Sequence, residues 1–184
     1  MVDLHVLIEL SGADAHERQT VPVGFVHVRL NFENETAEEL FDRLSIISAE
    51  LMLSTIEKLG KGEITPVKQT GEATYAPIIK KEMAHLDFAL NSSQIHNAVR
   101  GYYSWPCAFF FLDGKRIKVI KTKIGDKTTK IGGTVIGNTE NLVIACGENT
   151  SIEILELQPE GSKRMTAKQF LCGKAISLGK MIGE

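Results

Sequence analysis

The stretch CAFFFLDGKRIKV, residues 107–119, decides the fold of the second half of the chain. Its apolar part, Cys107 to Leu112, is typical of a buried β-strand. Asp113-Gly114 follows as a strong signal for the tight turn of a β-hairpin. Ile117 and Val119 then alternate with cations, which predicts a return strand with one buried face.

Three more short apolar segments follow this hairpin, at residues 134–136, 142–145 and 152–157. Together they give five short strands separated by turns, which suits a small closed sheet such as the oligonucleotide-binding (OB) barrel. Helical patterns lie on either side of the strands, at residues 91–100 and 166–171. We therefore predict a small five-stranded OB-like β-barrel with short helices.

The clearest helix of the sequence lies before the barrel, from Thr36 to Leu59. Thr36 and Glu39 have the spacing of a capping box, and apolar residues then recur with a period near 3.6. Two segments of alternating apolar residues, 4–10 and 26–30, precede the helix and predict two strands. Because two strands are a thin packing partner for such a helix, this region resembles the tail of a larger α/β unit.

The segment between the helix and the barrel reads ITPVKQTGEATYAPIIKK, residues 64–81. It holds two prolines and one glycine and has no sustained period, which is typical of an extended linker. The expected organisation is an α+β chain with an α/β part at residues 1–62, a linker at 63–81 and a barrel at 82–184.

The composition is that of an ordinary soluble protein: 43% of the residues are hydrophobic, 24% are charged, and the net charge is −2. These values exclude disordered, collagen-like and coiled-coil chains. No run approaches the roughly 20 apolar residues of a membrane span, and no basic flank marks a signal peptide. The three cysteines fit neither a disulfide framework nor a zinc site, so a reducing cytoplasm and no metal are expected.

Charge is divided unevenly along the chain. Residues 1–80 carry 7 basic and 13 acidic side chains, whereas residues 81–184 carry 14 basic and 10 acidic ones. A positive second half is a weak indication that it binds a polyanion.

Several sequence blocks together carry a resemblance to a known family. GEATYAP at residues 71–77, followed by Lys80-Lys81-Glu82, resembles the linker signature of methionyl-tRNA formyltransferases. The matching blocks keep the family's order and spacing over roughly residues 34–173, which is more specific than any single motif. The other blocks are Leu86-Asp87-Phe88, Ile95-His96-Asn97, Arg100-Gly101, Trp105-Pro106, Gly114-Lys115 and Leu157-Gln158-Pro159-Glu160-Gly161 with Lys163-Arg164-Met165.

The resemblance implies a fold and a partner. In that family a doubly wound domain holds 10-formyltetrahydrofolate and the formyl-transfer residues, and a linker leads to a C-terminal barrel that holds initiator tRNA. Residues 1–62 would then be the remnant of the doubly wound domain, with two strands and one or two helices. We expect initiator tRNA as the partner, no DNA or membrane partner, and no cofactor bound by this chain alone.

The catalytic part of the family pattern is poorly matched. The family's catalytic Asn and His lie near a Ser-Leu-Leu-Pro element that nothing in this sequence resembles. Its catalytic Asp lies in a Gly-x-Asp-Thr-Gly context, of which Gly12-Ala13-Asp14-Ala15-His16 is only a faint echo. Asp14 is therefore a weak catalytic candidate, and whether the chain is an enzyme stays open.

Seven cations lie within residues 115–130, against the single Asp126. Strand alternation would place Lys121 and Lys123 on one face with Lys115, provided that no bulge intervenes. Composition alone favours a solvated strand face, whereas the resemblance favours phosphates of tRNA, which would release condensed counterions there. The candidate tRNA-binding residues are Lys80, Lys81, Arg100, Lys115, Arg116, Lys118, Lys121, Lys123, Lys163 and Arg164.

Aromatic and histidine side chains near the barrel have simpler expected roles. Trp105 is expected to pack the barrel against the preceding helix, with stacking on nucleotides, beside Tyr102 and Tyr103, as the alternative. His85 and His96 lack metal-ligand spacing and are expected at surface or cap positions.

Three hypotheses are compatible with these patterns. The first is a tRNA-binding linker and barrel without formyltransferase activity of its own. In the second, the chain is one part of a split formyltransferase, completed by a separately encoded N-terminal piece that covers the apolar face of the helix. The third is the product of a disrupted gene.

Overall fold

The chain divides into two compact units, Met1–Pro77 and Ile78–Glu184, which we call unit 1 and unit 2. The expected three-part division, with a linker that ends at residue 81, stays a prediction. The computed structural model describes residues 7–11, 18–22, 34–68 and 77–182.

Unit 1 contains a small antiparallel sheet in the order β1-β2-β3. β1 (Leu7–Ser11) pairs with β2 (Arg18–Pro22), and β2 pairs with β3 (Val67–Lys68). β1 overlaps the first predicted strand, whereas the second, at residues 26–30, lies outside the described residues. A doubly wound sheet is mostly parallel, so the strands described in this unit do not have the pairing expected for its remnant.

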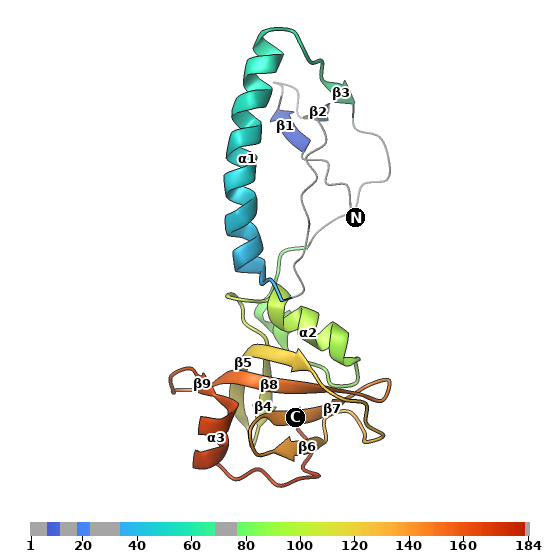
Figure 1. Cartoon of the computed structure of the whole chain (residues 1–184), viewed down its shortest axis with the longest axis vertical. Helices are drawn as coiled ribbons and strands as arrows, with labels where there is room; N and C mark the ends of the chain where they lie inside the picture. The colour runs from blue at the N-terminus through green and yellow to red at the C-terminus, as the bar shows by residue number, and fades with distance from the viewer. Residues whose placement is uncertain (1–6, 12–17, 23–33, 69–76, 183–184) are drawn as a thin grey trace. The chain divides into compact units, whose positions relative to one another are not determined.

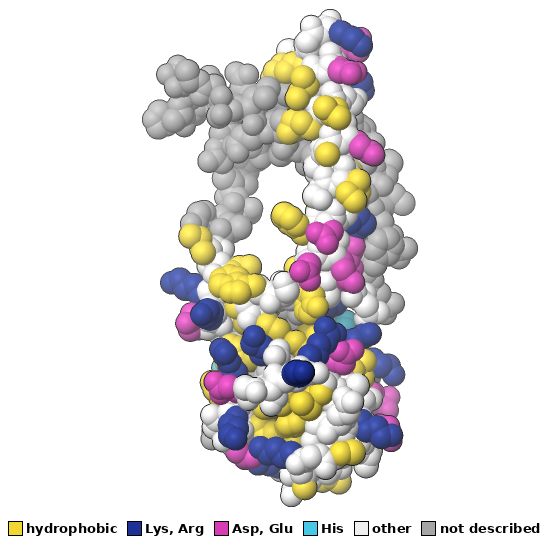
Figure 2. All heavy atoms as spheres, turned by 90° about the vertical axis from the view of Figure 1, so that its left-hand side faces the viewer, with side chains coloured by type: hydrophobic (Ala, Val, Ile, Leu, Met, Phe, Trp, Pro, Cys, Tyr) yellow, Lys and Arg dark blue, Asp and Glu magenta, His cyan; other side chains and the backbone are white. Residues whose placement is uncertain are grey.

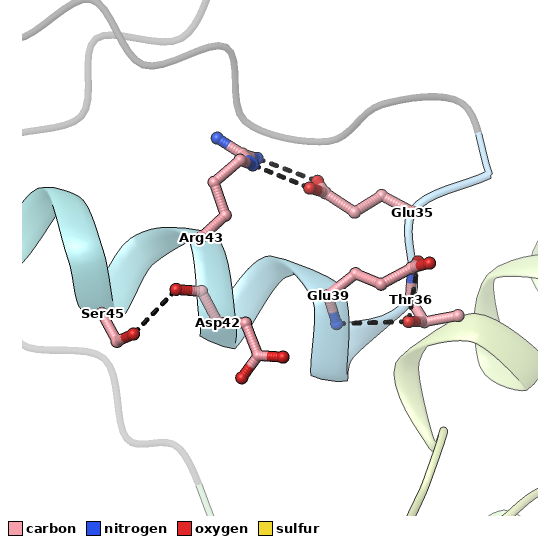
Figure 3. Close-up of polar contacts among 6 residues, drawn as sticks. All are labelled: Glu35, Thr36, Glu39, Asp42, Arg43 and Ser45. Atoms are coloured by element: carbon pink, nitrogen blue, oxygen red, sulfur yellow. Dashed lines mark hydrogen bonds and ion pairs between the residues drawn. The ribbon is translucent and has the colours of Figure 1, made fainter.

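Helix α1 (Ala37–Gly60) begins at the capping box that the sequence predicts. The backbone N–H of Glu39 donates to Oγ1 of Thr36 at 3.3 Å, and the Glu39 carboxylate accepts from the backbone N–H of Thr36 at 2.9 Å (Figure 3). Arg43 donates two hydrogen bonds, of 2.8 and 2.9 Å, to the carboxylate of Glu35, and these raise the pKa of its guanidinium. Local polar contacts therefore fix the start of the helix.

The predicted apolar stripe of α1 is half-buried, and Thr55 on the same side is only 2% exposed. Thr55 satisfies its buried hydroxyl by donating to the carbonyl oxygen of Leu51, one turn earlier, at 2.7 Å. The helix also presents a second set of apolar side chains to solvent. These are Phe41, Ile46, Leu53 and Ile56, with exposed fractions of 74%, 65%, 68% and 57%.

Unit 2 is a mixed α+β unit built on one curled antiparallel sheet (Figure 1). The strand order is β4-β5-β8-β7-β6, with β9 paired to β8. Strands β4 to β8 overlap the five segments predicted from the sequence, whereas closure into an OB-like barrel stays a prediction. The elements are η1 (Lys81–Ala84), α2 (Ser92–Gly101), β4 (Phe109–Leu112), β5 (Lys115–Ile124), β6 (Val135–Asn138), β7 (Leu142–Cys146), β8 (Thr150–Pro159), β9 (Met165–Thr166) and α3 (Ala167–Gly173).

The long strand β5 changes phase near its middle. Ile117 and Val119 are buried in its first half, whereas Thr122 is buried in its second half. The register between β5 and β8 shifts on both sides of Lys121. Such an irregularity interrupts the alternation of side chains, so positions of opposite parity face inward before and after it.

Helix α2 contributes to the buried core of this unit. Asn91, the first residue of the predicted helical segment 91–100, caps the helix, and Ile95 and Val99 are 1% and 2% exposed. His96 is only 8% exposed, and its Nδ1 lies 2.9 Å from Oγ1 of the buried Thr122 on β5. The expectation that His96 is a surface or cap residue is therefore wrong, because its ring lies on the inner side of the helix and is hydrogen-bonded there.

Close backbone contacts complete the unit. The backbone N–H of Gly147 donates to the carbonyl oxygens of Phe88 and Leu90 at 3.0 and 2.8 Å. A side chain at position 147 would overlap the carbonyl group of Ala89, so glycine is required there. Of the helices in the described part of the chain, none is both long and apolar enough to cross a membrane.

Candidate nucleic-acid interface

Four cations lie on the outward side of β5, and we call them the β5 cation row: Arg116, Lys118, Lys121 and Lys123. None of the four occupies a buried position, whereas Ile117, Val119 and Thr122 between them are buried. The change of phase at Lys121 is what brings even and odd positions to one side.

The register shift at Lys121 also determines on which face of β5 Lys115 lies relative to the other lysines. Lys115 is paired with the buried Leu112 at the hairpin end of β5 and is in phase with the buried Ile117. It is exposed because the strand begins there. The expectation that Lys115 shares a face with Lys121 and Lys123 is therefore wrong, because the proviso that no bulge intervenes does not hold.

Strand β8 sets different surroundings for the members of the row. Lys121 pairs in register with Glu156 and Lys123 with Glu153, whereas Lys118 pairs with the neutral Gln158. Within the described ranges, no member of the row forms an ion pair. The charge of the row is therefore open to an anionic partner, most fully in the half of β5 before the register shift.

The other predicted contact residues divide into exposed and engaged cations. Lys80, Lys81 and Lys163 are exposed. Arg164 donates to the carboxylate of Glu156, with an Nη2–Oε2 distance of 2.6 Å. The structure therefore leaves the three lysines accessible but partly neutralises Arg164. Arg100 is also engaged, since its guanidinium donates a hydrogen bond of 2.6 Å to Oδ1 of the neutral Asn97.

Trp105 lies at the surface, with 58% of its area exposed. The expectation that it packs into the core is wrong. Cys107, two residues later, is buried in the core: it is 5% exposed and its Sγ lies 3.8 Å from the carbonyl oxygen of Val119. The hydroxyl of Tyr103, in the same turn, accepts a weak hydrogen bond of 3.5 Å from Arg164.

The thiol of Cys107 reports the local charge. Burial raises its pKa, while the positive charges of Lys118, Arg164 and Arg116 oppose that increase. The charges of all three cations therefore reach the buried sulfur. Two of the three, Arg116 and Lys118, belong to the start of the β5 cation row.

A ring cluster beside the row was not predicted from the sequence. His85 stacks on Phe109 with ring centroids 5.3 Å apart, and both rings contact Phe111 with centroids 5.6 Å away. The guanidinium carbon of Arg116 lies 5.6 Å from the centroid of Phe109. Alternation along FFF indicates that Phe109 and Phe111 lie on the side opposite the buried Phe110, but no local pattern places His85 beside them.

Charge on the surface of unit 2 is mixed. Figure 2 shows Lys and Arg side chains spread over the visible face of this unit, with Asp and Glu among them. Asp113, for example, is held by Lys174 and Lys180, whose hydrogen bonds lower its pKa to about 2. An anionic ligand would therefore be positioned by particular unpaired cations and not by a uniformly positive surface.

The structure adds nothing to the catalytic prediction. Asp14 lies outside the described residues. No group of three or more His, Cys, Asp or Glu side chains is arranged as a metal site in the part of the chain that the structure describes. The site candidates among the described residues are the cations and the ring cluster, the two kinds of group that proteins use to contact nucleic acid.

Comparison with known proteins identifies relatives of the chain. The family model for the formyl transferase C-terminal domain matches residues 78–175. Methionyl-tRNA formyltransferase of Thermodesulfovibrio yellowstonii is 42% identical over 147 residues, which cover 80% of this chain and 47% of the relative. The enzyme of the same name from Citrifermentans bemidjiense is 34% identical over 178 residues, which cover 96% of this chain and 53% of the relative.

Solved structures show a similar fold at low sequence identity. A variant of HypX from Aquifex aeolicus is similar with a TM-score of 0.61 and 14% identity, over 94% of this chain and 31% of HypX. The sugar 3N-formyl transferase WlaRD is similar with a TM-score of 0.53 and 18% identity, over 85% of this chain and 55% of WlaRD. This chain spans about half the length of the curated relatives that it matches.

Proposed function

This chain belongs to the formyl transferase C-terminal domain family, and we propose that its unit 2 binds initiator tRNA for formylation of the methionyl group in the cytoplasm. The observation that carries the proposal is the β5 cation row, which has no ion pair among the described residues. The similarity to methionyl-tRNA formyltransferases supplies the kind of polyanion.

The physical basis of the proposed binding is counterion release. Each phosphate that a lysine or arginine neutralises releases condensed counterions, and log K falls by roughly 0.7 to 0.9 per contact for each unit of log salt. Four contacts from the row would therefore give a slope of about −2.8 to −3.6. Lys80, Lys81, Lys115 and Lys163 are exposed and would add to this value.

We assign no step of formyl transfer to the described residues. The reaction needs a general base and donors aimed at a developing oxyanion, and the predicted candidate, Asp14, is not among the described residues. We propose that 10-formyltetrahydrofolate, the donor implied by the resemblance, is bound by the other half of a formyltransferase.

A salt titration tests the proposed tRNA binding. The fluorescence of Trp105, the single tryptophan, would report binding of initiator tRNA to the full chain. Between about 0.05 and 0.2 M salt, four phosphate contacts lower the affinity roughly 50- to 150-fold. Absence of binding, or binding that ignores salt, would refute the proposal.

The exposed apolar side chains of α1 support a second function. Phe41 and Leu53 are 74% and 68% exposed, and large uncovered apolar patches often mark a partner surface. We propose that this patch binds the half of a formyltransferase that the chain does not match. That half would supply the donor site and the catalytic residues.

Co-purification tests this second function. The N-terminal half of a similar methionyl-tRNA formyltransferase is expected to co-purify with the full chain and to restore formylation of initiator tRNA. The variant F41Q/L53Q is expected to lose both, whereas E50Q/E57Q, which changes exposed polar side chains of the same helix, keeps them. Equal behaviour of the two variants, or an inactive purified pair, would contradict it.

A further inference from the structure

The ring cluster of His85, Phe109 and Phe111 lies on the outward side of the sheet. Phe110 and Leu112, the alternate residues of β4, are 0% and 1% exposed, whereas Phe109 and Phe111 are half-buried and His85 is exposed. The cluster is thus no part of the core. β4 ends the main strand order, and the backbone beside His85 pairs with its outer edge, where the N–H of Leu86 donates to the carbonyl oxygen of Phe109 at 2.8 Å.

A hollow opens beside two of these rings. His85 and Phe111 line a cavity of about 750 Å³, together with Asp87, Lys180 and Met181. Its volume is within the range of about 300–1,000 Å³ that is common for small-molecule sites. Phe88 lines it as well, so the wall combines three ring systems with a few polar groups, which suits a flat aromatic ligand with polar edges.

Cations lie next to the same rings. In the register of the hairpin, Arg116 is opposite Phe111 and Lys118 is opposite Phe109. Arg116 and Lys118 also line a second cavity of about 130 Å³, together with residues 158–161. A volume equal to about four water molecules of roughly 30 Å³ each leaves room for a phosphate group.

A ring wall and a cationic recess next to each other match one ligand, a nucleotide. We infer that the cavity beside His85 and Phe111 takes an unpaired RNA base, with the adjoining phosphate bound by Arg116 and Lys118. This inference rests on the proposed tRNA binding and names the part of the RNA that unit 2 contacts. A paired base cannot take this position, because both of its faces are covered within the helix.

Two RNA probes and three variants test the inference. The full chain is titrated with a labelled single strand of about eight adenylates and with a blunt RNA duplex of similar length, with anisotropy as the readout. H85A is expected to lose about fivefold or more in affinity for the single strand, since stacking on one ring contributes that much or more. Its affinity for the duplex and its salt slope are expected to stay unchanged, because no cation is removed.

Two controls separate stacking from a change in fold. H85F keeps a ring at the position and is expected to bind the single strand as the unmodified protein does. I124A removes another exposed apolar side chain of unit 2, 47% exposed, and is expected to leave both affinities unchanged. Single-strand binding by H85A that equals that of the unmodified protein, or an equal loss for both RNAs, would overturn the inference.

The proposed function fails in a different way. If the unmodified protein binds neither RNA, the proposed tRNA binding is overturned and this inference with it. If it binds both RNAs with a steep salt slope and H85A behaves identically, only the base site is overturned.

Discussion

Neutralising the start of the β5 cation row should weaken RNA binding by a calculable amount. In the variant R116Q/K118Q, two cations without ion pairs among the described residues become neutral amides of similar length. Loss of two phosphate contacts lowers the steepness of the log K against log salt plot by about 1.4 to 1.8. If these contacts contribute nothing near 1 M salt, the affinity at about 0.1 M falls roughly 25- to 60-fold.

The assay is anisotropy of labelled initiator tRNA over a series of salt concentrations. The matched control is K168Q/K174Q, which removes two cations already paired with Glu140 and Asp113 at 2.8 Å each. The control is expected to change the slope much less, because paired lysines release fewer counterions. Equal slopes for the two variants would refute the reasoning, since only total charge would then matter.

Three further predictions concern the fold of unit 2. Two lysines lower the pKa of Asp113 to about 2 from its ordinary 3.8, so its carboxylate stabilises the folded state above pH 4. That contribution is lost as the pH falls from about 4 to 2, and melting temperatures of D113N should lack this part of the pH dependence. Gly147→Ala should lower the free energy of unfolding by about 1–3 kcal/mol in denaturant titrations, because its methyl group overlaps the carbonyl of Ala89; unchanged stability would contradict the packing. Cys172 is exposed while the other two cysteines are buried, so a thiol reagent should modify one thiol in the native protein and three after denaturation.

Local signals predicted much of the fold. The Thr36–Glu39 capping box marks the start of α1, because its hydrogen bonds are made between residues three apart. Asp113-Gly114 marks the hairpin between β4 and β5, where both residues have positive φ angles of 53° and 73°. Asn91 likewise caps α2. Each signal depends only on neighbouring residues and can be recognised without tertiary contacts.

The candidate site was harder to predict, because it depends on contacts between distant segments. The register shift at Lys121 arises between β5 and β8, and it moves Lys115 away from the face of Lys123. His96 is buried because Thr122, far along the sequence, supplies its hydrogen bond. Trp105 is 58% exposed although a Trp-Pro pair after a helix is expected to anchor in the core. No local pattern encodes these outcomes.

Lysine footprinting on the bound complex tests most directly whether RNA lies along the outward side of β5. The full chain is acetylated with and without saturating initiator tRNA at low salt, and the modified lysines are quantified by mass spectrometry. Protection of Lys118, Lys121 and Lys123, with Lys58 and Lys168 equally modified in both samples, is the expected result. Bound tRNA that leaves the three β5 lysines as reactive as in the free protein would contradict the proposal.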